Sequence, residues 1–309
     1  MRPALFLSGA GLRLACVRFQ YMIERRTTKG WMRMIVYVNG QWMDDSTASV
    51  SFQDRAFVFA DAVYEVVYIY KGTYFKMDLH LERMQNGLDK LRIPFRADDL
   101  RSVFDELLQR NPGIERGILY VQVTRGAAPR AHGLPRLEQP TVVAYVKPLQ
   151  YDSRIWDNGG RAVFVEDLRW HMCNIKTTGL LLNCMAKETA LERGCDDAIF
   201  HRGEIVTEAS ASNLFIVKDG NLVTHPNGPW ILPGITRHVV IELAGKIGIP
   251  VIERPFTKDE LLAADELFLT GTTSEVAPYV EVEGQPIGNG QVGPITRRIQ
   301  KAFRQATGM

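Results

Sequence analysis

The chain has 309 residues, of which 46% are hydrophobic, so it can form one large or two ordinary globular domains that each bury a core. Its 37 Lys and Arg residues nearly balance its 35 Asp and Glu residues, and this balance makes nucleic acid an unexpected partner. The four cysteines form no CxxC pair, which disfavours a metal site or a disulfide-stapled secreted domain and favours reduced thiols in a cytoplasmic protein.

The first 33 residues differ in composition from the rest, because several arginines and a lysine stand against a single acid, Glu24. Such a bias resembles a targeting segment or a translated upstream stretch. The apolar run over residues 4–7 is too short to span a membrane. We expect residues 1–33 to be a disordered or artefactual extension, with an organellar targeting segment as the alternative, and the folded chain to start at Met34.

The next region alternates between strand and helix patterns. Asp78 is a candidate N-cap for the first helix, and Lys71-Gly72 marks a turn between two strands. The predicted elements, in order, are strands over 35–39, 64–70 and 73–77, helices over 78–91 and 98–110, and strands over 118–124 and 141–146.

A polar stretch around Pro148 and Gly159-Gly160 separates this region from a second one with its own strands and helices. It predicts a smaller N-terminal α/β domain over 34–148, a linker over 149–160 and a larger C-terminal domain over 161–309. The elements predicted beyond the linker are a strand over 162–166, a helix over 180–193, a hairpin-rich stretch over 198–224, a helix over 235–247, strands over 251–253 and 266–270, and a helix over 294–306. The irregular alternation favours an α/β or α+β fold, and a cleft between the two domains is the natural place for a ligand.

Three separate stretches could together form a cup for an anion. In the stretch over 232–237 a glycine precedes a helix, so that backbone N–H groups are free to bind a phosphate. A hydroxyl-rich turn follows a strand over 270–274, and Arg83 adds a planar guanidinium that can donate two hydrogen bonds at once. Each feature alone is more often a loop device, a cap or a solvated arginine.

Lys176 stands in a mostly uncharged neighbourhood before an apolar helix, which makes it a candidate for Schiff-base chemistry, although a solvated loop lysine is the commoner use of such a position. Glu208 lies among small residues that would let a large ligand approach closely, or it is an ordinary turn acid.

Arg125, Arg130 and His132 form a cationic loop that could receive a carboxylate, with a solvated basic loop as the alternative. Tyr64 begins a predicted strand and offers a hydroxyl, although packing is the commoner use of such an aromatic side chain.

Taken in order, these pieces resemble the fold-type IV family of pyridoxal-phosphate enzymes, the class IV aminotransferases, and within it the D-amino-acid transaminase (D-alanine aminotransferase) branch. The resemblance covers roughly residues 36–306. Its matching segments are 59–67, 80–83, 122–126, 129–132, 175–176, 207–213, 234–237 and 265–275. The Pro129-Arg130-Ala131-His132 segment separates this branch from branched-chain aminotransferases.

The resemblance implies a two-domain enzyme with pyridoxal 5'-phosphate in the interdomain cleft and no metal. Lys176 would form the internal aldimine and move the proton at the substrate Cα, and Glu208 would face the pyridine nitrogen. The other implied cofactor contacts are Arg83, Leu232, Ile235, Thr236 and Thr272, and the implied contacts to the substrate carboxylate are Tyr64, Arg130 and His132, the last two reaching in from the neighbouring subunit of a homodimer.

The implied reaction transfers an amino group between a D-amino acid such as D-alanine and 2-oxoglutarate. Some positions depart from the pattern of relatives: Ala60 and Ala62 stand where glycines are common, and Gly271 stands where some relatives carry a hydroxyl. The alternatives are an (R)-selective amine transaminase or a branched-chain amino acid transaminase on the same fold, and a catalytically silent phosphate-ligand binder.

Overall fold

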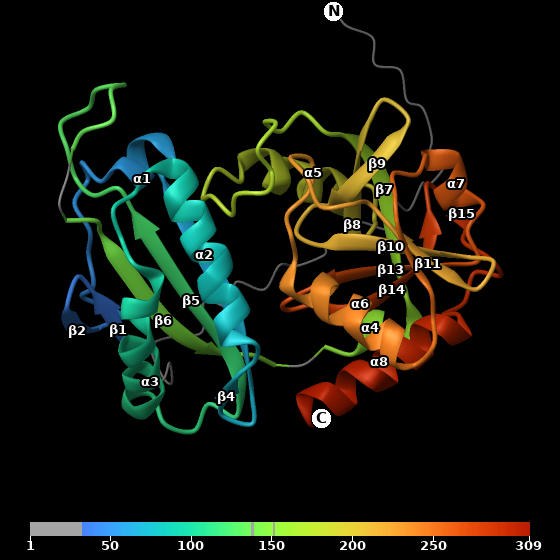
Figure 1. The fold of residues 1–309 in the computed structure, drawn as a ribbon, viewed down its shortest axis with the longest axis horizontal. Helices are drawn as coiled ribbons and strands as arrows, with labels where there is room; N and C mark the ends of the chain where they lie inside the picture. The colour runs from blue at the N-terminus through green and yellow to red at the C-terminus, as the bar shows by residue number, and fades with distance from the viewer. Residues whose placement is uncertain (1–32, 137–138, 151) are drawn as a thin grey trace, which may run out of the picture. The chain divides into compact units, whose positions relative to one another are not determined.

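The computed structural model describes residues 33–136, 139–150 and 152–309 (Figure 1). Within it, residues Met34–Met309 form one compact unit. The predicted extension over residues 1–33 lies outside the described residues except for Arg33, so its nature stays a prediction.

The first part of this unit is built on an antiparallel sheet of six strands in the order β2-β1-β6-β5-β3-β4. Its strands are β1 (Ile35–Val38), β2 (Gln41–Asp44), β3 (Ala62–Tyr70), β4 (Thr73–Tyr74), β5 (Arg116–Thr124) and β6 (Val142–Pro148). Its helices are α1 (Arg55–Phe59), α2 (Met77–Leu91), the 3-10 helix η1 (Ala97–Leu100) and α3 (Arg101–Arg110). Helices α2 and α3 bury apolar side chains such as Leu88 and Phe104 against the sheet, so a single apolar core joins them to β3 and β5.

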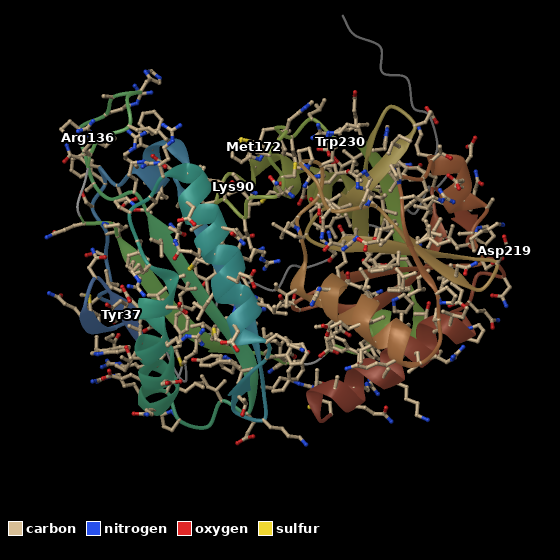
Figure 2. All side chains as sticks on the ribbon, viewed as in Figure 1. Tyr37, Lys90, Arg136, Met172, Asp219 and Trp230 are labelled. Atoms are coloured by element: carbon tan, nitrogen blue, oxygen red, sulfur yellow. The ribbon has the colours of Figure 1, made fainter. Side chains whose placement is uncertain are left out.

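The second part is built on a mixed sheet in the order β12-β11-β10-β13-β14-β7-β8-β9, with β15 paired to β14. Strand β7 runs parallel to both of its neighbours, β14 and β8, and β11 runs parallel to β12, whereas the remaining pairs are antiparallel. The strands are β7 (Gly160–Glu166), β8 (Asp197–Arg202), β9 (Ile205–Ala209), β10 (Asn213–Lys218), β11 (Asn221–Thr224), β12 (Val251–Glu253), β13 (Glu266–Gly271), β14 (Glu275–Val282) and β15 (Gln285–Pro286). The helices are α4 (Arg154–Asn158), α5 (Leu181–Glu192), α6 (Ile235–Lys246), α7 (Lys258–Leu262) and α8 (Pro294–Thr307). Figure 2 shows the side chains of Tyr37 and Lys90 on the first part and those of Asp219 and Trp230 on the second.

The predicted mixture of strands and helices is confirmed, and most predicted elements agree with the structure to within a few residues. The predicted N-cap is wrong. Helix α2 begins at Met77, its N-cap is Lys76 in the left-handed conformation, and the Asp78 carboxylate accepts a hydrogen bond from Arg101 instead. The predicted helix over 98–110 is a 3-10 turn followed by α3.

Several elements were not predicted from the sequence: β2, α1, α4, α7, β14 and β15. Strand β14 is the most consequential, because it joins β13 to β7 and so makes one continuous sheet. Pro278 lies inside it, and a proline normally argues against a central strand because it lacks a backbone N–H. The structure accommodates this proline because pairing with β7 begins only at Tyr279.

None of the helices in the described part of the chain is both long and apolar enough to cross a membrane.

Candidate active site

Lys176 is held against Tyr64 by the backbone of strand β3. The Tyr64 N–H donates a hydrogen bond to the Lys176 carbonyl at 3.0 Å, and Val63 and Thr177 form an isolated β-bridge. Ile175 is buried in the first core, which prevents the segment from moving away from the strand. The Lys176 Nζ therefore lies 3.2 Å from the Tyr64 hydroxyl and over the face of its ring, 4.2 Å from the centroid. The structure thus brings together the predicted amine and the predicted tyrosine.

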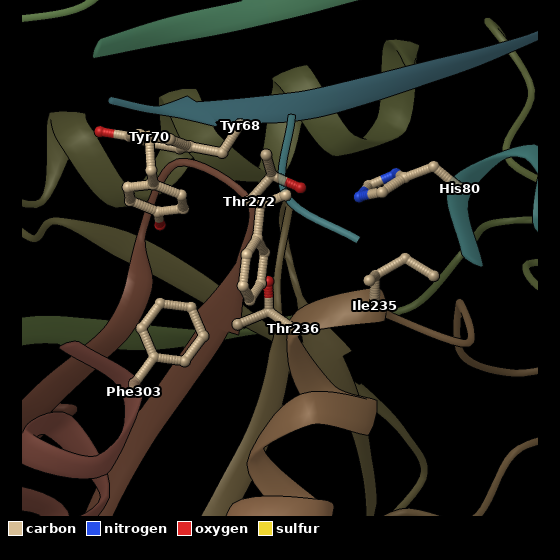
Figure 3. Close-up of a pocket in the computed structure, with 8 residues that line it drawn as sticks. Tyr68, Tyr70, His80, Ile235, Thr236, Thr272 and Phe303 are labelled. Atoms are coloured by element: carbon tan, nitrogen blue, oxygen red, sulfur yellow. The ribbon is translucent and has the colours of Figure 1, made fainter. Parts of the chain in front are cut away.

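A small pocket brings together three of the predicted phosphate contacts. Ile235, Thr236 and Thr272 line it together with His80 from α2, and Figure 3 shows the Thr272 side chain and the His80 ring facing one another across it. Tyr68 and Tyr70 of β3, Phe75 and Phe303 complete the lining.

Helix α6 leaves its first backbone N–H groups available in this pocket. The helix begins at Ile235, and its N-cap, Gly234, has extended backbone and contributes no side-chain cap. Free N–H groups and the helix dipole favour an anion at such a terminus. The glycine is required here, because a Cβ at position 234 would collide with Asn213 Oδ1.

Arg83 is fixed beside the same helix terminus by two kinds of acceptor. Its Nε and Nη2 donate to the two oxygens of Glu65, each at 2.7 Å, and its Nη1 donates to the Pro233 carbonyl at 2.9 Å. His80 Nδ1 lies 2.8 Å from the second Glu65 oxygen. Burial lowers the pKa of His80, with Glu65 opposing that shift, so the ring is neutral at neutral pH. A buried carboxylate thus orients both the guanidinium and the imidazole at the pocket.

Glu208 of β9 is a fully enclosed carboxylate with three donors around it. Its Oε2 accepts from the Leu232 backbone N–H at 2.9 Å and from Asn213 Nδ2 at 3.1 Å, and its Oε1 accepts from Arg169 Nη1 at 2.7 Å. Burial raises the pKa of Glu208, and the Arg169 guanidinium opposes the shift. The predicted cofactor contacts Glu208 and Leu232 are therefore bonded to each other.

Arg169 was missed by the sequence reasoning. It donates to both oxygens of Asp167, at 2.8 Å and 3.0 Å, as well as to Glu208. Arg202 also donates to Asp167, at 3.1 Å. No local signal marks this cluster, since its members come from the segment after β7 and from two further strands that only the folded sheet brings together.

Arg130 and His132 lie apart from Lys176 in the described contacts of this chain. The Arg130 guanidinium lies over the Phe59 ring, 5.2 Å from its centroid, and the His132 ring centroid is 5.7 Å from that of Phe59. Arg55 fixes the same loop by donating to the Ala131 carbonyl at 2.9 Å. Both predicted carboxylate contacts are exposed.

The prediction that Arg125 belongs to a free cationic loop is wrong. Its side chain is buried, and its Nε and Nη2 donate to Asp61 at 2.7 Å and 3.0 Å. Other donors bond the carbonyls of Leu91 and Arg92 at the end of α2. Arg125 is therefore a structural clamp whose partner acid lies on the segment before β3.

The described residues present an anion cup, a primary amine and a buried carboxylate. No cluster of metal-ligating side chains is found among them. A ligand with a phosphate, a carbonyl that an amine can attack and a ring nitrogen that can take up a proton would match these three features. Pyridoxal 5'-phosphate has all three, so the residues present fit that group.

Comparisons with known proteins agree with this chemistry. The family model for amino-transferase class IV matches residues 62–282. The D-alanine aminotransferase of Staphylococcus aureus (strain MSSA476) is 40% identical over 273 residues, which are 87% of this chain and 96% of that protein. The D-alanine aminotransferase of Bacillus licheniformis is 40% identical over 88% of this chain and 97% of its own length.

Solved structures with the same fold are branched-chain aminotransferases. The enzyme of Thermoproteus uzoniensis, solved with norvaline, is 31% identical with a TM-score of 0.81, covering 89% of this chain and 95% of that one. The enzyme of T.th., solved with pyridoxamine 5'-phosphate, is 26% identical with a TM-score of 0.83, and it too covers 89% of this chain and 95% of its own. The chain therefore belongs to the class IV aminotransferases, enzymes of fold-type IV that use pyridoxal phosphate.

Proposed function

We propose that the protein transfers an amino group between a D-amino acid of the D-alanine type and 2-oxoglutarate. The observation that carries this proposal is the 40% identity to D-alanine aminotransferases over nearly their whole length, against 31% or less for the branched-chain enzymes named above. D-alanine and 2-oxoglutarate would give pyruvate and D-glutamate.

The anion cup would hold the cofactor phosphate. Its donors are Arg83, the backbone at Ile235 and Thr236, and the hydroxyls of Thr236 and Thr272. The pocket lined by Ile235, Thr236 and Thr272, beside a helix start with free N–H groups, supports this assignment. Leu232 would lie against the ring, since its N–H already bonds Glu208. Glu208 would face the pyridine nitrogen and keep it protonated.

Lys176 would attach the cofactor and then act as the base and acid that moves the proton at the substrate Cα. When bound, pyridoxal phosphate supplies an electron-poor ring that stabilises the charge left when this proton is removed. Tyr64 supports the role of Lys176, because its hydroxyl accepts a hydrogen bond from the amine and holds it in one place.

Tyr64, Arg130 and His132 would bind the substrate α-carboxylate. A carboxylate, an amino group and a side chain fixed on three sides leave only one enantiomer with its Cα–H toward Lys176. Arg130 and His132 are exposed and contact Phe59 rather than Tyr64, so we propose that they act on the site of a neighbouring subunit in a homodimer. The exposed rings of Phe52 (79%) and Phe57 (80%) nearby would be covered by that partner.

We further propose that residues 34–148 and 161–309 act as two domains joined by the linker over 149–160, with the cofactor between them. The pocket supports this arrangement, because its lining comes from β3 and α2 on one side and from α6, α8 and the turn after β13 on the other. The reduced cysteines support a cytoplasmic location, since Cys173, Cys184 and Cys195 are all free thiols.

A branched-chain aminotransferase is the second candidate, because the solved structures named above have that activity in their titles. An (R)-selective amine transaminase is a further alternative on the same fold. Both would bind the cofactor in the same way and differ only in the amino donor.

The deciding experiment supplies purified holoprotein with 2-oxoglutarate and a panel of donors: D-alanine, L-alanine, L-leucine and a chiral amine without a carboxylate. Turnover of D-alanine with little of L-leucine or the amine supports the proposal, and a preference for L-leucine overturns it. Borohydride reduction followed by mass mapping tests the attachment separately. A pyridoxyl group on Lys176 is expected, and a group on another lysine contradicts the assigned site.

A further inference from the structure

The contacts of Glu208 include one that the proposed function does not use. Arg169 Nη1 donates to Glu208 Oε1 at 2.7 Å, while the other two donors to this carboxylate, Asn213 and the Leu232 backbone, are uncharged. Among the described residues, Arg169 is the one cation bonded to Glu208. Its side chain is 9% exposed and that of Glu208 is 6% exposed, so solvent screens this pair little.

Arg169 is itself held from behind. Its Nε and Nη2 donate to the two oxygens of Asp167, and its guanidinium lies over the Phe200 ring, 4.2 Å from the centroid. Asp167 is fully enclosed and also accepts from Arg202 and from the Thr207 hydroxyl. The planar guanidinium is therefore locked in one orientation, with a single edge directed at Glu208.

The charges of this cluster balance without the cofactor. Arg169 and Arg202 carry positive charge, and Asp167 and Glu208 can each carry a negative charge. Although burial alone would raise the pKa of Asp167, its bonds to the two arginines hold it below the ordinary value, so Asp167 is ionised. Burial raises the pKa of the nearby Cys173 thiol to about 11, so Cys173 adds no charge near neutral pH.

Burial acts on Glu208 in the same direction as on Cys173, toward the protonated form, and the negative charge of Asp167 adds to it. The Arg169 guanidinium and the Leu232 N–H oppose that tendency. Without the guanidinium, nothing charged among the described groups around Glu208 would favour the carboxylate over the neutral acid.

We propose that Arg169 is a positioning residue that keeps Glu208 ionised and correctly turned, and so keeps the proton on the pyridine nitrogen of the bound cofactor. This inference rests on the proposed role of Glu208. It assigns to Arg169 an effect on the cofactor without any contact to the reacting atoms.

Arg202 offers a matched control. It bonds the same Asp167 and also donates to the backbone carbonyls of Arg169 and Trp170, so its loss disturbs the same loop. The interactions found for Glu208 in the described residues do not include Arg202. Arg202→Met therefore perturbs the structure around Arg169 and leaves the charge at Glu208 in place, whereas Arg169→Met removes that charge. Arg169→Lys restores a cation without the planar fork.

The measurement is the nitrogen NMR shift of ¹⁵N-labelled pyridoxal phosphate bound to each full-length variant, which reports whether the ring nitrogen is protonated. We expect a protonated nitrogen in the wild type and Arg202→Met, an unprotonated one in Arg169→Met, and partial recovery in Arg169→Lys. Titration of the apoprotein with pyridoxal phosphate should show binding roughly 10- to 100-fold weaker for Arg169→Met, the size expected for one lost hydrogen bond to a charged group.

A protonated nitrogen in Arg169→Met overturns the inference, as does an equal change in Arg202→Met, which would assign Arg169 a purely structural role. If Arg169→Met does not fold, the shift in Arg169→Lys decides: a protonated fraction equal to that of the wild type with unchanged pH dependence contradicts the inference, and a reduced fraction supports it. A wild type that carries an unprotonated ring nitrogen, or no cofactor on Lys176, contradicts the proposed function itself, so the two failures are distinct.

Discussion

Replacing Glu65 with glutamine removes one negative charge from the interior and keeps nearly the same side-chain volume. In the structure this carboxylate is 2% exposed and accepts from Arg83 Nε and Nη2 at 2.7 Å each, with His80 Nδ1 at 2.8 Å. A glutamine has one oxygen to accept with, and its NH₂ group would face donors. The Arg83 guanidinium would then be buried without its counter-charge, retaining its bond to the Pro233 carbonyl.

Breaking a buried ion pair by removing one partner typically costs about 3–5 kcal/mol, because the remaining charge is desolvated and uncompensated. We expect Glu65→Gln to lose free energy of unfolding in this range. For a protein of this size, the midpoint of thermal unfolding should fall by on the order of 10 °C.

Asp78 supplies the matched control. Its carboxylate lies 2.7 Å from Arg101 Nη1, the same distance as in the Glu65–Arg83 pair, but the Asp78 side chain is 86% exposed. Ion pairs exposed to water contribute little because solvent and salt screen them. Asp78→Asn should therefore leave the unfolding midpoint unchanged.

The assay is thermal unfolding of the apoprotein and of protein saturated with pyridoxal phosphate. A bound phosphate gives Arg83 a new anionic partner, so the loss in Glu65→Gln should be smaller in the saturated protein. A loss below about 1 kcal/mol in the apoprotein would refute the buried-pair reasoning. An equal loss in Asp78→Asn would show that burial is not what distinguishes the two pairs.

Three further outcomes follow from the site. Lys176→Ala should give no borohydride-fixed pyridoxyl group and no turnover, measured by mass mapping and by the donor panel; a label at another lysine would contradict it. Arg130→Ala should keep the label and raise KM for donors with a carboxylate, and unchanged D-alanine kinetics would refute its role. Although burial alone would raise the pKa of Glu65, the Arg83 and His80 contacts hold it far below 4.5. Its stabilisation is therefore fully present above about pH 4.5 and is lost as the pH falls, so the difference in unfolding midpoint between wild type and Glu65→Gln should shrink on acidification.

Local signals in the sequence predicted the parts of the site that depend on local structure. A glycine before an apolar periodic stretch predicted a helix over 235–247, and α6 spans Ile235–Lys246 with Gly234 as its N-cap. The hydroxyl-rich turn after a predicted strand places Thr272 in the same pocket as Thr236. Both features are set by residues within a few positions, so their structure needs no knowledge of distant partners.

Elements that depend on neighbouring strands were harder to predict. Strand β14 contains Pro278, which sequence rules exclude from a central strand, and it is tolerated only because β7 starts pairing one residue later. Asp78 has the residue type of an N-cap, yet the turn after β4 places Lys76 in the left-handed conformation and starts the helix earlier than the rule expects. Both outcomes depend on the register of other segments.

The charged residues show this dependence most clearly, because sequence reasoning gave Arg125 and Arg130 of the same loop equal standing. The β3–β5 register pairs Ala62 with Thr124, and this places Asp61 against the next residue, Arg125, whose donors it occupies. Arg130 is a few residues further along, beyond the end of β5, and its side chain remains exposed over Phe59. An arginine can capture a substrate carboxylate only if its donors are not already bonded, so strand register, and not residue type, decides which of the two is available to a ligand.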